Sequence, residues 1–579
     1  MIVLGVRSGH DASACIVNNG VIIANVAEER FTRIKNDGSF PIQSIDYCLK
    51  QANITSKDID ILTIPANILP IEYKIFFDFP KEYSLTKFLF KASNTVNKLT
   101  NRKGVVTALE TKEINDIDYN KVEISLPLYQ NRFKLSASCK IYLVGHHLSH
   151  ASSAAYTSGW DNEDFIVATM DGRGDGISNA IWKCKKNTLQ CMDMYDGNSS
   201  LGWFYACATE ALGWRQNRGE WKLMGLASYG KRCNGILDNL HPRFYDGKLE
   251  FEYKYSNFGR WNDHGANHYN NNLSKVLKKI VHEVGRENFS AEVQAVVERE
   301  TMNLILPRMK KYGLKKLSAA GGFFLNVKLN QKLWYSKEIS DFWVFPDAGD
   351  AGLSLGSVLF VNNYLKKSPC PRLNSMYLGP SFSNEEIKFI LDQRHLKYNY
   401  YDNIHLKAAE LLAKNNIIGW FQGRMEFGPR ALGNRSILAN PIIKENHELV
   451  NKRIKFRESF RPFCPTVLYE DADDYLQKSF IAEHMVVSFE ATEKAKNQIP
   501  AVIHVDNTVR PQILLKEKNK LFYKLLQSFK KLTGVPVVLN TSFNIRGEPI
   551  VCTPSDAIKC FFDTGMDAVI IGNYIISKK

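Results

Sequence analysis

The alternation of apolar and polar residues near the start of the chain predicts short strands separated by tight turns. Residues 2–27 contain the apolar segments IVLGVR, ACIVN and VIIANVA, which are separated by SGHDAS and NG. Asn19-Gly20 between two such segments is a strong signal for a β-hairpin. A comparable unit recurs at 165–184, where FIVATM and ISNAIWKC flank DGRGDG. The recurrence predicts an α/β fold with an internal duplication.

Later segments predict a second domain. Residues 290–312 have apolar positions at helical spacing and are expected to form core rather than a site. Residues 408–420 predict a helix followed by a strand, and GVPVVLNTSFN at 534–544 predicts another strand. Two prolines within SPCPRL, residues 368–373, indicate a linker between domains.

The two strand–turn–strand units resemble the organisation of the actin, sugar-kinase and Hsp70 superfamily. Proteins of that superfamily consist of two ribonuclease H-like halves with a nucleotide between them. The region 64–140, between the units, is rich in aromatic residues and lysine and has no site signature. We expect an insertion with helices there, used for contacts in a homodimer or for binding an acceptor.

Composition narrows the class of protein. The chain has 579 residues, of which 44% are hydrophobic and 23% charged, values typical of a soluble protein with two or three domains. The eleven cysteines include no CxxC pair, which favours reduced thiols over disulfides or a cysteine-built zinc site. No signal peptide and no apolar run of about 20 residues is evident, so we expect a cytoplasmic protein without a membrane partner.

The net charge of +15 raises nucleic acid as a partner. The lysines are spread along the chain, however, and neither an RNA-binding signature nor a basic tail is present. Part of the excess is explained if arginines bind a phosphorylated small molecule. Nucleic acid is therefore not the expected partner.

The stretch Phe421–Ile437, FQGRMEFGPRALGNRSI, has the composition of an anion-binding loop. It contains Arg424, Arg430 and Arg435, interleaved with glycines and a proline. The planar guanidinium binds phosphate or carboxylate through paired hydrogen bonds. Further basic residues follow in similar turn-like contexts, including Lys455, Arg461, Arg510 and Arg546. A solvated basic surface is the alternative, but such surfaces are usually built from Lys and Glu.

Two histidines in VGHHLSHASSAAY predict a metal site. His146 and His150 are four residues apart and share one face if the segment is helical. Asp171 in MDGRGDG and Asp350 in PDAGDAG could complete the ligand set. Two imidazoles and two carboxylates suit Fe(II), Mn(II) or Zn(II). A structural role for the histidines remains the alternative, and His147 is the neighbour most easily mistaken for a ligand.

Two short turns add candidates for catalysis and nucleotide binding. His10 and Asp11 lie in the first predicted turn, where His10 is a general-base candidate if the turn faces the site. The segment AAGGFFLN offers Gly321, Gly322 and Asn326 as nucleotide contacts. A surface histidine and a chance glycine pair are the alternatives.

Taken together, these motifs resemble the NodU/CmcH family of O-carbamoyltransferases. The motifs that carry the resemblance occur in one order over nearly the whole chain: GHDASA, EERFTRIKNDGSFP, HHLSHASSAAY, MDGRGDG, KLMGLASYG, GGFFLN, GDAG, QGRMEFGPRALGNRSIL, FRESFRPFCP and NTSFN-RGEP. The departures are small. Phe323 and Phe324 stand where smaller residues are usual, and Cys464 stands where alanine is common.

The resemblance implies two catalytic domains and a final segment. Residues 1–367 are similar to the actin-like threonylcarbamoyl transferases, and residues 374–552 are similar to the YrdC fold. Residues 553–579 form a C-terminal segment, with a return to the N-terminal domain as one option. The YrdC-like domain would convert carbamoyl phosphate and ATP, with Mg(II), into carbamoyl adenylate. The N-terminal domain would pass the carbamoyl group to a small-molecule hydroxyl with the help of a metal, Fe(II) being favoured.

The resemblance also implies roles for individual residues. The metal ligands would be His146, His150, Asp171 and Asp350. The transfer base would be His10, with Asp11 beside it. The carbamoyl phosphate and nucleotide contacts would be Arg424, Arg430, Lys455, Arg461, Arg510, Asn540 and Arg546, together with Gly321, Gly322 and Asn326. A sugar or natural product, as in antibiotic biosynthesis, is the expected acceptor. A tRNA-modifying transferase and a sugar kinase are the alternatives.

Overall fold

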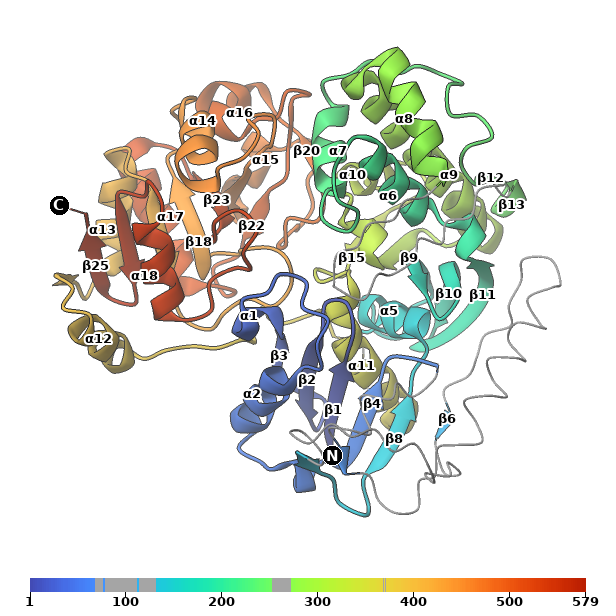
Figure 1. The fold of residues 1–579 in the computed structure, drawn as a ribbon, viewed down its shortest axis with the longest axis horizontal. Coiled ribbons are helices and arrows are strands. Elements are labelled where there is room, and N and C mark those ends of the chain that lie inside the picture. Colours follow the sequence, from blue (N-terminus) through green and yellow to red (C-terminus); the bar gives the residue numbers. More distant parts are fainter. Residues whose placement is uncertain are drawn as a thin grey trace.

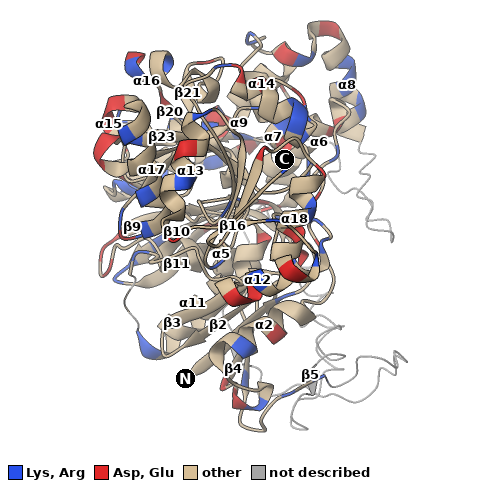
Figure 2. Ribbon diagram, turned by 90° about the vertical axis from the view of Figure 1, so that its left-hand side faces the viewer, with Lys and Arg blue, Asp and Glu red and all other residues tan. Residues whose placement is uncertain are grey.

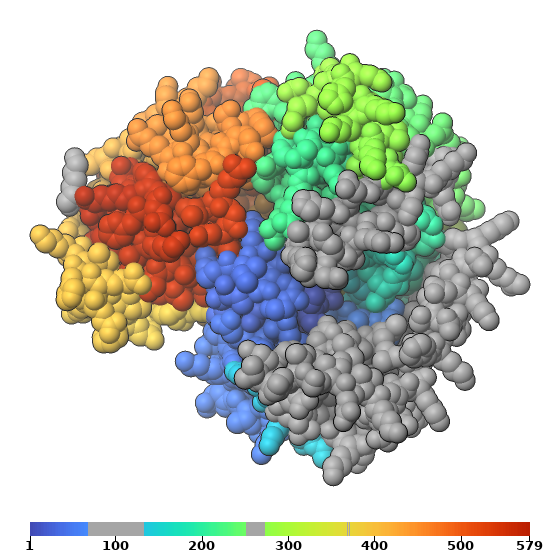
Figure 3. Space-filling view, in the orientation of Figure 1, coloured from blue at the N-terminus to red at the C-terminus, as the bar shows by residue number. Residues whose placement is uncertain are grey.

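The structure, a computed structural model, describes residues 1–67, 77–78, 112–113, 132–251, 272–367, 369 and 371–578. Two sheets with their helices form the N-terminal half, and one larger sheet with its helices forms the C-terminal half (Figure 1). The α/β class predicted from the sequence is confirmed. Figure 3 shows the surface of the C-terminal half against both the blue first part and the green later part of the N-terminal half.

The first N-terminal sheet begins with the predicted hairpins. Its strands are β1 (Ile2–Arg7), β2 (Ser13–Asn18), β3 (Val21–Ala27), β4 (Ile61–Ile64), β6 (Lys112–Glu113) and β8 (Lys140–Leu143). They lie in the order β3-β2-β1-β4-β8-β6. Strand β1 is antiparallel to β2 and parallel to β4, and β4 is parallel to β8.

The second N-terminal sheet repeats this arrangement. Its strands are β9 (Phe165–Gly174), β10 (Ile177–Lys185), β11 (Thr188–Asp196), β14 (Lys316–Ala320) and β15 (Asp341–Val344). Their order is β11-β10-β9-β14-β15, and β9 is antiparallel to β10 but parallel to β14. With the added edge strand β6 of the first sheet set aside, the strands of both sheets are arranged third, second, first, fourth, fifth. This shared topology confirms the predicted duplication.

Two helices lie between these sheets and link them. Helix α5 (His146–Ala155) packs on β9 and β14, and helix α11 (Leu353–Lys366) packs on β1, β2 and β4. The two helices also pack against each other (Figure 1). The helices approach so closely at Gly356 that a Cβ there would lie only 2.1 Å from the Ser149 carbonyl oxygen. This contact therefore requires glycine. The ends of α5, β9 and α11 are thereby brought together.

Other helices cover the outer faces of the two sheets. Helix α2 (Ile42–Ala52) packs on β2 and β3, and α6 (Leu201–Ala211) packs on β9. The predicted helix at 290–312 lies within α9 (Arg286–Tyr312) and contributes many buried residues. The remaining helices of this half are α1 (Glu29–Thr32), α7 (Glu220–Ala227), α8 (Asn272–Val284) and α10 (Val327–Trp334).

The C-terminal half is built on an eight-stranded mixed sheet in the order β16-β25-β24-β17-β18-β23-β19-β22. Its strands are β16 (Asn399–Tyr400), β17 (Ile418–Phe421), β18 (Arg435–Ala439), β19 (Cys464–Leu468), β22 (Gln512–Leu514), β23 (Val537–Ser542), β24 (Ala568–Ile571) and β25 (Tyr574–Ser577). The helices are α12 (Asn384–Gln393), α13 (Ile404–Ala413), α14 (Asn446–Val450), α15 (Ala472–Tyr475), α16 (Glu493–Gln498), α17 (Lys520–Thr533) and α18 (Pro554–Phe562).

The chain passes between the halves in an irregular segment after α11, where the prolines of SPCPRL predict a linker. The described residues of the segment 553–579 do not return to the N-terminal domain, which the sequence left as one option. Strand β24 pairs with β17, and β25 pairs with β24 and β16, so this segment completes the C-terminal sheet. The predicted helical insertion at 64–140 lies mostly outside the described residues. No helix in the described part of the chain is both long and apolar enough to span a membrane.

Candidate metal centre and anion-binding site

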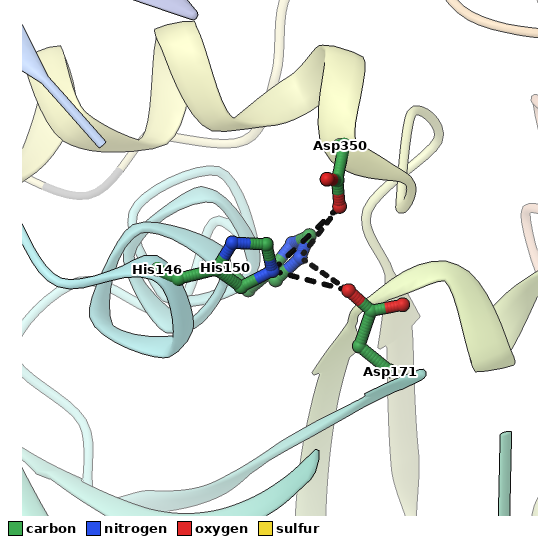
Figure 4. Close-up of side chains that lie close together, drawn as sticks. All are labelled: His146, His150, Asp171 and Asp350. Carbon is green, nitrogen blue, oxygen red and sulfur yellow. Dashed lines mark hydrogen bonds and ion pairs between the residues drawn. The ribbon is translucent and has the colours of Figure 1, made fainter. Parts of the chain in front are cut away.

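The four predicted metal ligands lie together. His146 and His150 project from α5, Asp171 lies in β9, and Asp350 lies just before α11 (Figure 4). One ligand atom from each residue lies within 4.8 Å of the others. The Nε2 atom of His146 is 3.1 Å from Asp171 Oδ2 and 3.6 Å from Asp350 Oδ1. Helical spacing explains the histidines, and the sheet topology explains the carboxylates.

The chemistry of this cluster fits a cation. The imidazole of His150 is 1% exposed, and its Nε2 is 3.7 Å from each carboxylate, beyond hydrogen-bonding distance. That buried nitrogen has no hydrogen-bond partner among the described residues. Burial opposes ionisation of Asp171, but the two imidazoles outweigh it and hold the pKa of the carboxyl well below its usual range. Two imidazoles and two ionised carboxylates are a donor set for Fe(II), Mn(II) or Zn(II).

Neighbouring residues fix the ligands in place. Arg7 Nη2 donates to Asp350 Oδ2 at 2.8 Å, a contact that the sequence analysis did not identify. His147 points away from the cluster, because its ring nitrogens lie 3.0 Å from Thr169 Oγ1 and 3.1 Å from the Ile177 carbonyl. Burial lowers the pKa of His147 to about 3, so this ring is neutral. His147 is thus structural, as expected.

His10 lies at the edge of the same cluster, in the turn between β1 and β2. Its Nδ1 is 3.0 Å from Asp11 Oδ2, and Asn36 donates to the other oxygen of Asp11 at 2.6 Å. Burial alone would lower the pKa of His10, but Asp11 and, more weakly, Asp350 and Asp171 raise it to about 9. The ordinary pKa of a free imidazole therefore does not apply here. A cation held by Asp350 and Asp171 would offset part of this shift.

The glycine-rich segment after β14 lies beside the candidate metal centre. Gly321 has φ +100°, and a Cβ there would lie 2.0 Å from the Met170 carbonyl. A Cβ on Gly322 would lie 3.1 Å from Asp171 Oδ1. Asn326 caps α10 by accepting from the Leu329 amide, and its amide also exchanges hydrogen bonds with Gln294. The side chain of Asn326 is thus engaged in local structure rather than free for a nucleotide.

A second, basic site lies on loops at one end of the C-terminal sheet. Arg430 belongs to the loop between β17 and β18, and Arg510 precedes β22. Arg510 Nε donates to Cys464 Sγ at 2.9 Å. Burial and the neighbouring Arg510 lower the pKa of Arg430 to about 9. Burial and the surrounding arginines, Arg457 first among them, lower the pKa of Arg461 to about 8.

Burial is the larger cause of these depressed pKa values, and repulsion among the arginines adds to it. Several guanidinium groups are held together without enough carboxylates to balance them, which is expected of a site that binds a polyanion. The Nε atoms of Arg430 and Arg461 are buried without hydrogen-bond partners among the described residues. Arg546 contributes from the rim, with a side chain that is 58% exposed and a hydrogen bond to the Phe456 carbonyl.

Two arginines of the Phe421–Ile437 stretch, Arg424 and Arg435, do not join this cluster. Arg424 donates to the carbonyls of Leu378, Gly379 and Ile23, the last of which lies in β3 of the other half. Arg435 is fully buried and donates to four backbone carbonyls while stacking on Phe421. Both guanidinium groups are occupied by the protein itself. Of the three arginines in the stretch, only Arg430 remains available to an anion.

Lys455 and Asn540 are both buried and donate hydrogen bonds to neighbouring loops. The buried ammonium of Lys455 donates to the Asn544 carbonyl at 3.0 Å and to its side-chain oxygen at 2.8 Å. Asn540 is fully buried, and its amide donates to the Ala431 carbonyl and to Thr466 Oγ1. Glu426 helps as well, since its Oε1 accepts from the amides of Leu432, Asn434 and Arg435. Glu426 and Asn540 thus hold the loop that carries Arg430, whereas Lys455 holds the turn after β23.

The basic site also includes residues that the sequence analysis missed. Arg457 lies among the arginines, where burial and Arg510 lower its pKa to about 10 although Cys464 opposes the shift. Lys35, in the loop after α1, comes from the N-terminal half. Burial lowers its pKa, and Arg461 and Arg218 add to the effect. Arg457 could have been inferred from the sequence, because it lies in the same basic segment, KRIKFRESFRPF, as the predicted Arg461.

The fold and the sites thus define a two-part α/β protein with a buried His₂Asp₂ cluster and a cluster of buried arginines. The protein-family model described as Carbamoyltransferase N-terminus matches residues 2–359, and the one described as Carbamoyltransferase C-terminus matches residues 409–578. The chain belongs to the carbamoyltransferase family. The predicted family is confirmed by these two matches.

Curated relatives agree with this assignment. The nodulation protein NolNO of Sinorhizobium fredii is 33% identical over 98% of this chain and 79% of the relative. The nodulation protein NolO of Bradyrhizobium diazoefficiens is 35% identical over 75% of this chain and 79% of the relative. An uncharacterised protein of Synechocystis is 35% identical over 98% of this chain and 95% of its own length.

Two solved structures are only weakly similar to this chain. Component A of the (R)-2-hydroxyglutaryl-CoA dehydratase of Acidaminococcus fermentans covers 63% of this chain and 98% of its own, at 12% identity and a TM-score of 0.34. HypF of T. kodakarensis covers 63% of this chain and 48% of its own, at 11% identity and a TM-score of 0.33. Scores this low carry no argument, and the duplicated topology described above rests on the strand order alone.

Proposed function

We propose that this carbamoyltransferase works in two steps at two sites, with ATP as a co-substrate. In the first step, carbamoyl phosphate, ATP and water give carbamoyl adenylate, pyrophosphate and phosphate at the arginine cluster. In the second step, the carbamoyl group passes to a hydroxyl of a small molecule beside the His₂Asp₂ cluster, and AMP leaves. The observation that carries the proposal is the presence of both sites, each with buried unpaired nitrogen atoms, in one chain.

The arginine cluster suits the first step. Carbamoyl phosphate and ATP together bring many negative charges, and fixed cations in a pocket of low dielectric stabilise them strongly. Arg430, Arg461 and Arg510 would bind the phosphate groups, with Arg546 at the rim. The crowding that depresses the pKa values of Arg430 and Arg461 in the free protein would be relieved when the anions bind. We infer a YrdC-like role for this half on the same ground.

The N-terminal site suits the second step. His146, His150, Asp171 and Asp350 would hold the metal, with Fe(II) favoured, and a bound cation there would polarise the carbamoyl carbonyl. His10 would accept the proton of the attacking hydroxyl when its imidazole is neutral. Asp11 would fix the orientation of that ring through the 3.0 Å contact to Nδ1. Gly321 and Gly322 would allow the substrate to approach Asp171 closely.

The acceptor is proposed to be a small molecule, a sugar or natural product, rather than a nucleic acid. Acidic and basic residues are interspersed along the helices in the ribbon of Figure 2, whereas nucleic-acid-binding proteins usually concentrate Lys and Arg on one face. A cytoplasmic location and a homodimer remain expectations of the sequence. The region 64–140, for which dimer or acceptor contacts are predicted, lies largely outside the described residues.

The decisive assay uses labelled carbamoyl phosphate and ATP with a panel of sugars, aminoglycosides and polyketides. We expect label to appear in one class of acceptor, and AMP and pyrophosphate to form in step with it. Transfer of label without ATP consumption would contradict the adenylate route. ATP turnover that is independent of carbamoyl phosphate would instead support a sugar kinase, and salt-sensitive binding of tRNA would support the tRNA-modifying alternative.

A further inference from the structure

One segment of the C-terminal half is held by a helix of the N-terminal half. This docking segment, Glu458–Pro462, lies against α7, which begins at Glu220. Its Phe460 ring lies between the rings of Trp214, at 6.2 Å, and Tyr229, at 6.4 Å. Gly225 of α7 faces the same ring, since a Cβ there would lie in van der Waals contact with Phe460, at 3.8 Å. The docking segment therefore packs against aromatic side chains of the N-terminal half.

The same helix contacts the two charged residues of the docking segment. The guanidinium carbon of Arg461 lies 3.3 Å from the centroid of the Trp221 ring, so the two groups are stacked. The ammonium of Lys222 lies 3.0 Å from Glu458 Oε1, and Glu458 Oε2 lies 3.8 Å from Arg461. Trp221 thus contacts Arg461 directly, and Lys222 contacts it through Glu458.

We propose that Trp221 and Lys222 are positioning residues of the anion site, so that the N-terminal half completes the site in which carbamoyl phosphate is activated. The inference rests on the proposed function. It assigns to α7 a role in the first step, although the helix belongs to the half that carries the metal centre. Neither residue is placed to touch the substrate. Both act through the orientation of Arg461 and Glu458.

Electrostatic repulsion among the arginines explains why Arg461 needs positioning residues. Arg461 lies close to Arg457, Arg546 and Arg510, which repel it. An aromatic face attracts a cation without adding a negative charge that would compete with the substrate phosphates. Lys222 meanwhile pairs with Glu458 and limits the attraction of that carboxylate for the guanidinium groups. Trp221 therefore holds Arg461 in place while leaving its positive charge available to an anion.

The experiment compares Trp221→Ala, Trp221→Phe and wild type. Binding of inorganic pyrophosphate is measured by calorimetry, and pyrophosphate release is measured against the concentration of carbamoyl phosphate. Loss of a cation–π contact should weaken pyrophosphate binding and raise the KM for carbamoyl phosphate by about 3–30-fold, with a smaller change in kcat. Trp221→Phe keeps a ring and should recover most of the loss. The content of bound metal should be the same in all three proteins.

Lys328→Gln is the matched control. Lys328 lies on α10 and pairs with Asp506 across the same two halves, but it does not contact the arginines. We expect this variant to bind pyrophosphate as wild type does. Wild-type pyrophosphate binding by Trp221→Ala, an equal loss in Lys328→Gln, or no recovery in Trp221→Phe would overturn the proposal. If wild type releases no pyrophosphate with carbamoyl phosphate, the proposed function fails, and the calorimetry still tests the role of Trp221.

Discussion

The metal centre and the anion site are built in different ways. The metal ligands come from a helix, a strand end and the turn before a helix, and these elements are fixed by the packing of α5 against α11. The arginines come from loops, and their neighbours repel them. A site on regular elements is rigid by construction, whereas a site on loops needs buried supports. In this protein the supports are Glu426 and Asn540 for the loop with Arg430, Lys455 for the turn after β23, and α7 for Arg461.

This difference predicts different consequences of mutation. Changes at the metal centre should affect one chemical step and leave the surrounding elements folded. Changes at the anion site should affect both steps, because the second step consumes the product of the first. Changes at supporting arginines should affect stability rather than chemistry. The following variants separate these three outcomes.

The largest effect is expected for His150→Ala. The variant should lose bound metal, because one of four ligands is removed from a buried site. Acceptor carbamoylation should fall to background, while carbamoyl-phosphate-dependent pyrophosphate release continues. Metal analysis and the two assays are run on the same sample, with circular dichroism as the control for folding. A metal content equal to that of wild type would show that HxxxH is structural.

A smaller but still large effect is expected for His10→Asn. Removing a positioned general base typically lowers the rate by about 10²–10⁴-fold. The variant should keep its metal and form carbamoyl adenylate without passing it on. Equal loss in both steps would instead indicate a role in nucleotide binding or folding.

The pH profile sharpens this prediction. Because the surrounding carboxylates raise the pKa of His10 to about 9, most of the ring is protonated at pH 7 in the metal-free protein. A base must be neutral, so the transfer rate should rise with pH towards that value. A bound cation weakens the effect of Asp350 and Asp171 and should move the rising limb to lower pH. His10→Asn should lack this limb, and an unchanged profile would rule His10 out as the base.

Arg430→Ala and Arg424→Gln compare an available arginine with an occupied one in the same loop. Loss of the Arg430 contact should cost about 1.5–3 kcal/mol of anion binding and misplace the phosphate, lowering adenylate formation by about 10²-fold or more. Arg424 donates only to carbonyls, apart from a long contact to Tyr47. Arg424→Gln should therefore lower the melting temperature and keep the KM for carbamoyl phosphate. The reverse pattern would mean that the two arginines have been assigned the wrong roles.

The smallest effect concerns the pH dependence of metal affinity. Although burial opposes it, Asp171 and Asp350 raise the pKa of His150 to about 9 in the metal-free protein. A metal must displace that proton, so affinity should rise with pH up to about 9 and then level off. Folding stability of the metal-free protein should change in the opposite direction. It should fall between about pH 6.5, the ordinary pKa of histidine, and pH 9, because His150 loses its proton and with it the attraction to Asp171 and Asp350. Titrations at fixed ionic strength measure both.

The sequence predicts the metal centre more fully than the anion site, for a physical reason. Helical spacing places His146 and His150 on one face, and carboxylates in glycine-rich turns mark strand ends. Both signals are local. Whether an arginine is free to bind an anion depends on distant parts of the chain, because the guanidinium groups of Arg424 and Arg435 donate to carbonyls of other segments. Asn326 was likewise predicted to contact a nucleotide, whereas it caps α10. Trp221 and Lys35 enter the anion site only through the docking of the two halves.

The most direct test of the two-site account is carbamoyl-phosphate-dependent pyrophosphate release by wild type, His150→Ala and Arg430→Ala, with Mg(II) as the only added metal. The account predicts release at nearly the same rate from wild type and His150→Ala, and little release from Arg430→Ala. Parallel loss in His150→Ala and Arg430→Ala, or wild-type release from Arg430→Ala, would contradict the division of the reaction between the two halves.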